Sequence, residues 1–157
     1  MLRKGVKFLK KLIVIFLILI GLLISVILFR FISTTSFGEM LAEDISETDE
    51  ITHINLYSRV EDEPLWLQID DPEMINTLIE EQSIISIRNQ YKRIQKTLDY
   101  SMTIHTRFNS YYFDFDDEFF SGRRSDYKII NGSFIEPILQ LDDDLEWLTG
   151  DELFNTD

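Results

Sequence analysis

The side chains that could do chemistry in this chain are mostly carboxylates, which gather in two short runs. The first run holds Asp114, Asp116, Asp117 and Glu118, and the second holds Asp142, Asp143, Asp144 and Glu146. A calcium site needs about six to eight oxygen ligands, and an EF-hand loop needs glycine at its sixth position. The runs place Phe119 and Trp147 there, which excludes an EF-hand. A looser metal site, or a metal-dependent enzyme that uses these acidic clusters, stays an alternative function.

The histidines, serines and cysteines indicate no catalytic centre. His53 and His105 are the chain's two histidines, and both fall on predicted strands without the extra, closely spaced ligands that zinc requires. The chain has no cysteine, which excludes thiol chemistry and a disulfide framework. No serine lies in a G-x-S-x-G motif, and no glycine-rich phosphate loop is present. We therefore expect a non-enzymatic protein without a cofactor.

Aromatic residues are the strongest candidates for a binding surface. Residues 52–60, 65–69 and 99–117 alternate apolar and polar side chains, as strands of an antiparallel sheet do. Six aromatic residues lie on or beside these segments: Tyr57, Trp66, Tyr111, Tyr112, Phe119 and Phe120. If the alternation holds, they cannot all face one core, and an aromatic strand face would suit a protein partner or a wall polymer. The alternative is that a helix covers that face.

The strands and helices that would position these side chains follow the order β-β-α-β-β-β-α. The predicted elements are two strands within 52–69, a helix from Pro72, a hairpin over 99–117, a strand over 126–130 and a C-terminal helix over 133–148. The first helix has the clearest start, because an aspartate caps it and Pro72 fits its first turn. Residues 83–98 have a helical period but stay ambiguous between helix and loop. We predict an α+β fold with a small antiparallel sheet packed with two or three helices.

An uncharged apolar run from Leu12 to Phe29 places the chain in a membrane. As a helix, its eighteen residues would span roughly 27 Å, close to the ~30 Å hydrocarbon core. Basic residues precede the run and acidic residues follow it, so we expect a cytoplasmic N-terminus and an extracytoplasmic C-terminal part. The alternative is a cleaved signal peptide, whose apolar region is shorter, about 7–15 residues.

The membrane segment divides the chain into parts. We predict a basic cytoplasmic N-terminus over 1–11, a transmembrane signal anchor over 12–32, an acidic tether over 33–50, an extracytoplasmic domain over 51–149 and an acidic tail over 150–157. Within the tether, Phe37 and Leu41 could lie on one apolar side of a short helix. Within the anchor, Gly21 and Ser25 form a small-xxx-small pair that can let two helices approach closely. An accessory subunit that acts through this helix is a further alternative function.

The formal net charge of −13 conceals a strong asymmetry. Residues 1–31 hold six basic residues and no acidic one, whereas residues 32–157 hold nine basic and all twenty-eight acidic residues. So acidic a domain should repel nucleic acid, and we expect no such partner. One basic cluster interrupts it, formed by Arg88, Lys92, Arg93 and Lys96. This cluster either balances acidic faces of the same domain or binds an anionic partner or the bilayer surface.

In layout and composition, residues 50–148 behind their membrane helix resemble the small, functionally unassigned extracytoplasmic domains of Gram-positive bacteria. The resemblance includes no diagnostic motif and implies no activity. It implies a single-pass protein of the cell membrane. Together with the aromatic residues, it leads us to expect a non-enzymatic interaction domain at the outer membrane face that binds a protein partner.

Overall fold

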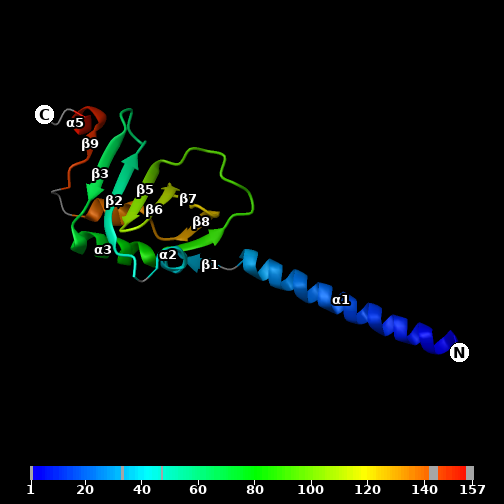
Figure 1. Cartoon of the computed structure of the whole chain (residues 1–157). Coiled ribbons are helices and arrows are strands. Elements are labelled where there is room, and N and C mark those ends of the chain that lie inside the picture. The colour runs from blue at the N-terminus through cyan, green and yellow to red at the C-terminus, as the bar shows by residue number, and fades with distance from the viewer. Residues whose placement is uncertain (1, 33, 47, 142–144, 155–157) are drawn as a thin grey trace. The chain divides into compact units, whose positions relative to one another are not determined.

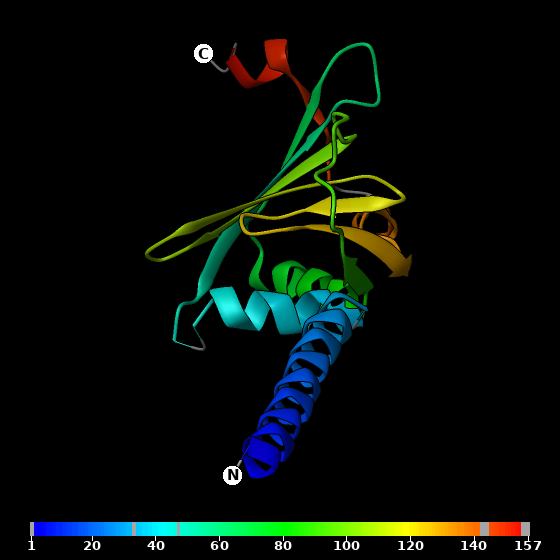
Figure 2. The same ribbon diagram turned by 90° about the vertical axis from the view of Figure 1, so that its right-hand side faces the viewer.

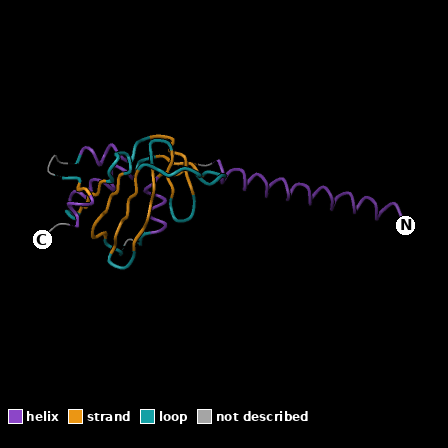
Figure 3. The backbone as a smooth tube through the Cα atoms, turned by 90° about the horizontal axis from the view of Figure 1, so that it is seen from above, coloured by secondary structure: helices purple, strands orange, loops and turns teal. Residues whose placement is uncertain are grey.

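The chain folds as two compact units, Met1–Ser33 and Thr34–Asp157, in a computed structural model that describes residues 2–32, 34–46, 48–141 and 145–154 (Figure 1). The first unit is one helix, α1 (Leu2–Ile32), drawn as an uninterrupted coil in Figure 3. Its segment Lys11–Phe29 is long and apolar enough to cross a membrane. The predicted apolar N-terminal helix is thus confirmed, and by length and composition it fits a membrane anchor or a signal sequence alike.

The second unit is built on one antiparallel sheet, so the predicted α+β class is confirmed. Among the described residues the sheet has nine strands, in the order β1-β4-β8-β7-β6-β5-β2-β3-β9. The strands are β1 (Thr34–Ser36), β2 (Ile51–Ser58), β3 (Leu65–Ile69), β4 (Ser86–Asn89), β5 (Tyr100–Thr106), β6 (Ser110–Phe115), β7 (Phe119–Ser121), β8 (Asp126–Asn131) and β9 (Leu148–Thr149). All neighbouring strands pair antiparallel. The sheet is therefore larger than the small one we expected.

Helices pack on one face of this sheet, and the core lies between the two layers. They are α2 (Phe37–Asp44), α3 (Pro72–Ser83) and α4 (Ile135–Gln140), and Figure 2 shows α2 and α3 on the same side of the strands. The predicted cap of α3 is confirmed, because the Asp71 side chain accepts hydrogen bonds from the backbone N–H groups of Glu73 and Met74. Every second residue of a strand points into the core, for example Ile54 and Leu56 of β2, because successive side chains of a strand point to opposite faces.

Residues 34–44, which we expected in a tether, belong to the folded domain. Ser36 caps α2 through a capping box with Glu39, and Phe37 is fully buried. The Phe37 ring meets three others edge-on, with centroid distances of 5.7 Å to Phe113, 5.4 Å to Phe120 and 5.0 Å to Phe134. A short acidic segment has the composition of a linker. Here the contacts of one buried aromatic side chain offset the conformational entropy that is lost when the segment becomes ordered.

The contact between α2 and α3 is close enough to require glycine. A Cβ atom added at Gly38 would lie 2.8 Å from the Cβ of Ser83 and 3.1 Å from its carbonyl oxygen. Only a residue without a side chain allows these backbones to approach so closely. The contact fixes α2, and with it the start of the domain, against the rest of the helical layer.

Residues 83–98 form no helix beyond the end of α3, so their helical period is misleading. They contain β4 and then an irregular crossover, residues 90–99, that leads to β5. Strands β4 and β5 are separated in the sheet by β8, β7 and β6. The apolar residues at helical spacing therefore have different surroundings: Ile87 belongs to the core and Leu98, within the crossover, is buried, whereas Tyr91 is exposed.

The C-terminal region also differs from the single long helix that we expected. Helix α4 ends at Gln140, and Leu148–Thr149 adds β9 to the edge of the sheet, where Trp66 of β3 pairs with Leu148. The first part of the expected acidic tail forms a short helix, α5 (Gly150–Phe154). Covering the edge of β3 removes an exposed row of backbone hydrogen-bonding groups, which is a common reason for such a short strand.

Candidate interaction surface

The sheet face opposite α2, α3 and α4, called the outer face below, carries polar strand residues together with four aromatic ones, Tyr57, Trp66, Tyr112 and Phe119. Strand alternation places Ile54 and Leu56 in the core and His53, Asn55 and Tyr57 on the outer face. The neighbouring strands continue it in register, because Tyr57 pairs with Trp66 of β3 and with Ser101 of β5. The outer face is thus a continuous surface across β3, β2, β5 and β6.

The predicted aromatic residues divide between the two faces. Tyr57 and Trp66 lie together on the outer face with ring centroids 4.9 Å apart, and the Arg59 guanidinium lies 4.9 Å from the centre of the Tyr57 ring. Tyr112 is 67% exposed. Phe119 is half-buried under Lys96, whose Nζ lies 5.0 Å from the ring centre. These four residues remain candidates for a binding surface.

The other two aromatic candidates, Tyr111 and Phe120, are placed elsewhere. Phe120 is fully buried among core phenylalanines, so its proposed place on an exposed surface is wrong. Tyr111 packs against the core, and its hydroxyl donates a hydrogen bond of 3.0 Å to the Asp44 carbonyl oxygen at the end of α2. Adjacent strand residues point to opposite faces, so Phe119 and Phe120 cannot share a surface.

Three of the four carboxylates of the first acidic run pair with arginine or lysine side chains of the same domain. Asp114 lies 3.5 Å from Arg59 and also accepts a hydrogen bond from Ser101. Glu118 and Lys128 form a 3.2 Å ion pair. No cluster of three or more potential metal ligands occurs in the part of the chain that the structure describes. The second run includes residues 142–144, which lie outside the described residues.

Asp116 is the buried member of this run. Its carboxylate lies 2.6 Å from Lys96 Nζ and accepts hydrogen bonds from the backbone N–H groups of Glu118 and Phe119. Burial by itself would raise the pKa of Asp116, but these hydrogen bonds and the Lys96 charge outweigh it and lower the pKa. The same pair raises the pKa of Lys96. Asp116 therefore ties the crossover to the turn between β6 and β7.

The two histidines meet on the outer face, although they are distant in sequence. His53 and His105 pair across β2 and β5, and their rings stack with centroids 4.2 Å apart and planes 10° apart. His105 Nε2 lies 3.2 Å from the Asn55 amide nitrogen, and its Nδ1 lies 2.9 Å from the Ser110 hydroxyl. Because an amide nitrogen only donates, His105 Nε2 accepts, and the arrangement suits a neutral imidazole. Two stacked imidazoles supply too few ligands for a zinc site.

Acidification should therefore weaken the fold through His105. Partial burial, and secondly the neighbouring His53, lower the pKa of His105 below its ordinary value of 6.5. The unfolded chain then binds more protons than the folded one, so we expect the free energy of unfolding to fall as pH drops through about 6.5. NMR titration of the two imidazoles measures the pKa directly. In a His53→Asn variant the pKa of His105 should rise towards 6.5, and an unchanged value would contradict this account.

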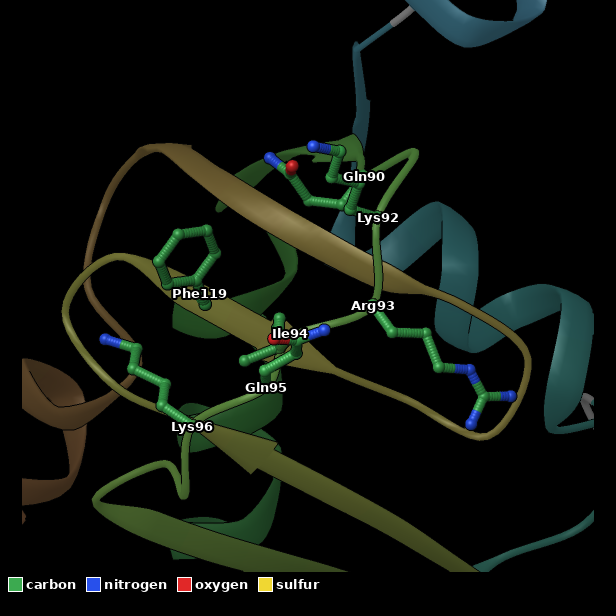
Figure 4. A pocket seen from close by; sticks show the side chains of 7 residues that line it. All are labelled: Gln90, Lys92, Arg93, Ile94, Gln95, Lys96 and Phe119. Atoms are coloured by element: carbon green, nitrogen blue, oxygen red, sulfur yellow. The ribbon is translucent and has the colours of Figure 1, made fainter.

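The crossover adds a second, basic feature beside the aromatic one. Its residues surround an open groove of about 760 Å³ whose lining includes Lys92, Arg93, Lys96 and Phe119. In Figure 4 the Lys96 side chain extends on the side of Phe119, whereas Arg93 extends in the opposite direction. The backbone N–H of Ile94 donates to an Asp126 carboxylate oxygen at 2.8 Å, which fixes the middle of the crossover on β8.

Sequence reasoning found the basic residues and most outer-face aromatics, but it missed the histidine pair and the ion pairs that occupy the first acidic run. The only signal in the sequence for the histidine pair was that both histidines fall on predicted strands. Whether they lie opposite each other depends on which strands become neighbours and in what register. Comparison with protein-family models, curated proteins and solved structures found no match. The candidate surface is therefore defined by its own geometry.

Proposed function

We propose that this chain is a single-pass membrane protein whose extracytoplasmic domain, without catalysis, binds a protein partner on the outer face. The observation that carries the proposal is the pairing of Tyr57 with Trp66 on the sheet face opposite α2, α3 and α4, with Arg59 against the Tyr57 ring. Tyrosine, tryptophan and arginine are the residues that most often dominate binding energy at protein interfaces. Tyr112 extends the same face onto β6 with a largely exposed ring.

The rigidity of this face supports its use as an interaction surface. Arg59 donates hydrogen bonds to the Leu98 carbonyl oxygen at 2.9 Å and to the Ser101 hydroxyl at 2.6 Å. These bonds hold the guanidinium in place before a partner arrives, so less side-chain entropy is lost on binding. An envelope enzyme or metal protein using the first acidic run is less well supported, because Arg59, Lys96 and Lys128 pair with three of its four carboxylates.

Site-specific photocrosslinking in intact membranes tests the proposal. A photoreactive phenylalanine analogue placed at Tyr112 should crosslink one protein species, whereas the same analogue at Phe108, an equally exposed ring on the β5–β6 turn, should not. Because the Tyr57–Trp66 pair is the expected centre of binding, a Trp66→Ala change should reduce the Tyr112 crosslink by at least about tenfold, as the loss of a binding hot spot would.

A second set of variants separates this proposal from the helix alternative. If the chain acts as an accessory subunit through α1, changing Gly21 and Ser25 to leucine should abolish the crosslink, because both small residues would be needed for close helix packing. If the outer face is the binding module, the crosslink should survive that change and respond only to Trp66→Ala. Equal crosslinking from Tyr112 and Phe108, or none from Tyr112, would contradict the proposal.

A further inference from the structure

The basic residues of the folded domain fall into two groups, those in ion pairs and those without a partner. Arg59, Lys96, Arg124 and Lys128 each pair with a carboxylate. Among the described residues, no ion pair is formed by the other five cations, which are all exposed: Arg88, Lys92, Arg93, Arg107 and Arg123. In a domain with three times as many acidic as basic residues, unpaired cations need an explanation.

Four of these cations, all except Arg107, lie on the crossover, on β4 and on the β7–β8 turn. Arg93 and Arg123 line one small polar pocket of about 220 Å³, together with Arg124 and the Ser121 and Ser125 residues of the β7–β8 turn. Figure 4 shows the Arg93 side chain extending away from Lys96 and Phe119, towards that turn. On the sheet, Arg88 of β4 pairs directly with Lys128 of β8. We call Arg88, Lys92, Arg93 and Arg123 the basic surface.

The chemistry of the basic surface suits phosphate groups. Three guanidinium groups and two hydroxyls line the polar pocket, and guanidinium groups bind phosphate oxygens through paired hydrogen bonds. The carboxylate within the pocket, Asp126, is already engaged by the Ser121 hydroxyl at 2.7 Å and by the Ile94 backbone. Its charge is therefore partly compensated. Arg124 pairs with Asp44, whereas Arg93 and Arg123 form no ion pair among the described residues and remain available.

The connection of the chain favours a lipid as the source of the phosphate. Strand β1 begins at Thr34, two residues after α1 ends at Ile32, and two extended residues span at most about 7 Å. Thr34 pairs directly with Arg88 of the basic surface. The edge strand that is covalently joined to the membrane segment thus lies beside Arg88, one of the cations without an ion pair.

We infer that the basic surface docks the domain on the headgroups of anionic phospholipids. The acidic remainder of the domain does not prevent this, since charges farther than about 8 Å are largely screened at physiological salt. An orientation that turns an acidic face towards the bilayer is disfavoured, because its carboxylates would then lie within that distance of the anionic headgroups. This inference uses the membrane location, but it is independent of the protein partner proposed above, because the Tyr57–Trp66 pair belongs to other strands.

The full chain, reconstituted into vesicles, allows a direct test. Because the chain has no cysteine, a Gln95→Cys change gives one labelling position on the exposed crossover. A fluorophore there should be quenched by nitroxide-labelled headgroups more strongly in vesicles containing phosphatidylglycerol than in phosphatidylcholine alone. High salt should remove the difference, because attraction between exposed charges is screened.

Variants identify the residues responsible. Changing Arg88, Arg93 and Arg123 to glutamine should remove most of the phosphatidylglycerol-dependent quenching without changing the melting temperature, because these side chains form no ion pair in the described structure. The matched control is Arg107→Gln, which removes another exposed cation without an ion pair, on the β5–β6 turn. This control should leave the quenching unchanged.

Three outcomes would overturn the inference. Equal quenching in both vesicle types would show that headgroup charge does not hold the domain. A change in the fluorescence of the label when inorganic phosphate is added to phosphatidylcholine vesicles, with no effect of phosphatidylglycerol, would identify a free-phosphate site instead. A response to soluble poly(glycerol phosphate) alone would identify an anionic polymer as the ligand. Loss of the Tyr112 crosslink would bear only on the protein-binding proposal.

Discussion

Changing Phe37 to alanine should lower the free energy of unfolding of the folded domain by about 3–5 kcal/mol, the usual cost of deleting a buried aromatic ring. The ring is fully buried and meets Phe113, Phe120 and Phe134 edge-on. Its removal leaves a cavity between α2 and the sheet that the surrounding side chains cannot fill. Urea unfolding of the unit that begins at Thr34, followed by tryptophan fluorescence, measures the change.

The matched control is Glu43→Ala, which removes an exposed side chain from the same helix. It should change the unfolding free energy by less than about 0.5 kcal/mol. A second comparison removes the segment altogether, with a fragment that begins at Ile51. If α2 belongs to the core, this fragment should fail to unfold cooperatively. Cooperative unfolding of the Ile51 fragment with unchanged stability would show that residues 34–50 are a tether after all.

Changing Asp116 to alanine should cost about 2–3 kcal/mol, because its carboxylate accepts hydrogen bonds from two backbone N–H groups and from Lys96, and bonds to a charged group are the stronger kind. The backbone N–H groups of Glu118 and Phe119 would lose their acceptor in the β6–β7 turn. Urea unfolding measures the loss. Asp117→Ala is the matched control, since that neighbouring carboxylate is exposed, and it should have almost no effect.

The pH dependence of stability gives a second readout for Asp116. Its pKa is lowered in the folded domain, so the unfolded chain takes up a proton first as the pH falls. The stabilisation is present above the ordinary aspartate pKa, 3.8, and is lost as the pH falls from there through the folded value. An Asp116→Asn variant should lack this part of the acid dependence. A wild-type slope in the variant would show that other carboxylates carry it.

Comparing Lys96→Ala with Asp116→Ala separates the contribution of the ion pair from that of the backbone hydrogen bonds to Asp116. Lys96 is half-exposed, so solvent screens its attraction to Asp116 and Lys96→Ala should cost less than Asp116→Ala. The larger share of the effect belongs to the turn that Asp116 closes. The crossover is held on the sheet by such contacts, at Lys96 and at the Ile94–Asp126 hydrogen bond.

Periodic features of this protein were predictable from sequence alone. The charge-free run Leu12–Phe29 predicted the long apolar helix, since span length and hydropathy are properties of consecutive residues. Alternation predicted β2, β3, β5 and β6, and the aspartate before Pro72 predicted the start of α3. These signals act over a few residues, where the period of side chains and local capping bonds decide the backbone conformation.

The tertiary structure alone decided which residues became neighbours. Phe37, predicted in a tether, and Phe120, predicted on an exposed surface, are both buried in the core. An aromatic ring is more stable packed against other rings than exposed to water. The same long-range pairing stacked His53 on His105 and matched the first acidic run with Arg59, Lys96 and Lys128. Contacts of this kind depend on the order of the strands. That order is determined by how the whole sheet buries its apolar face, so no short stretch of sequence predicts it.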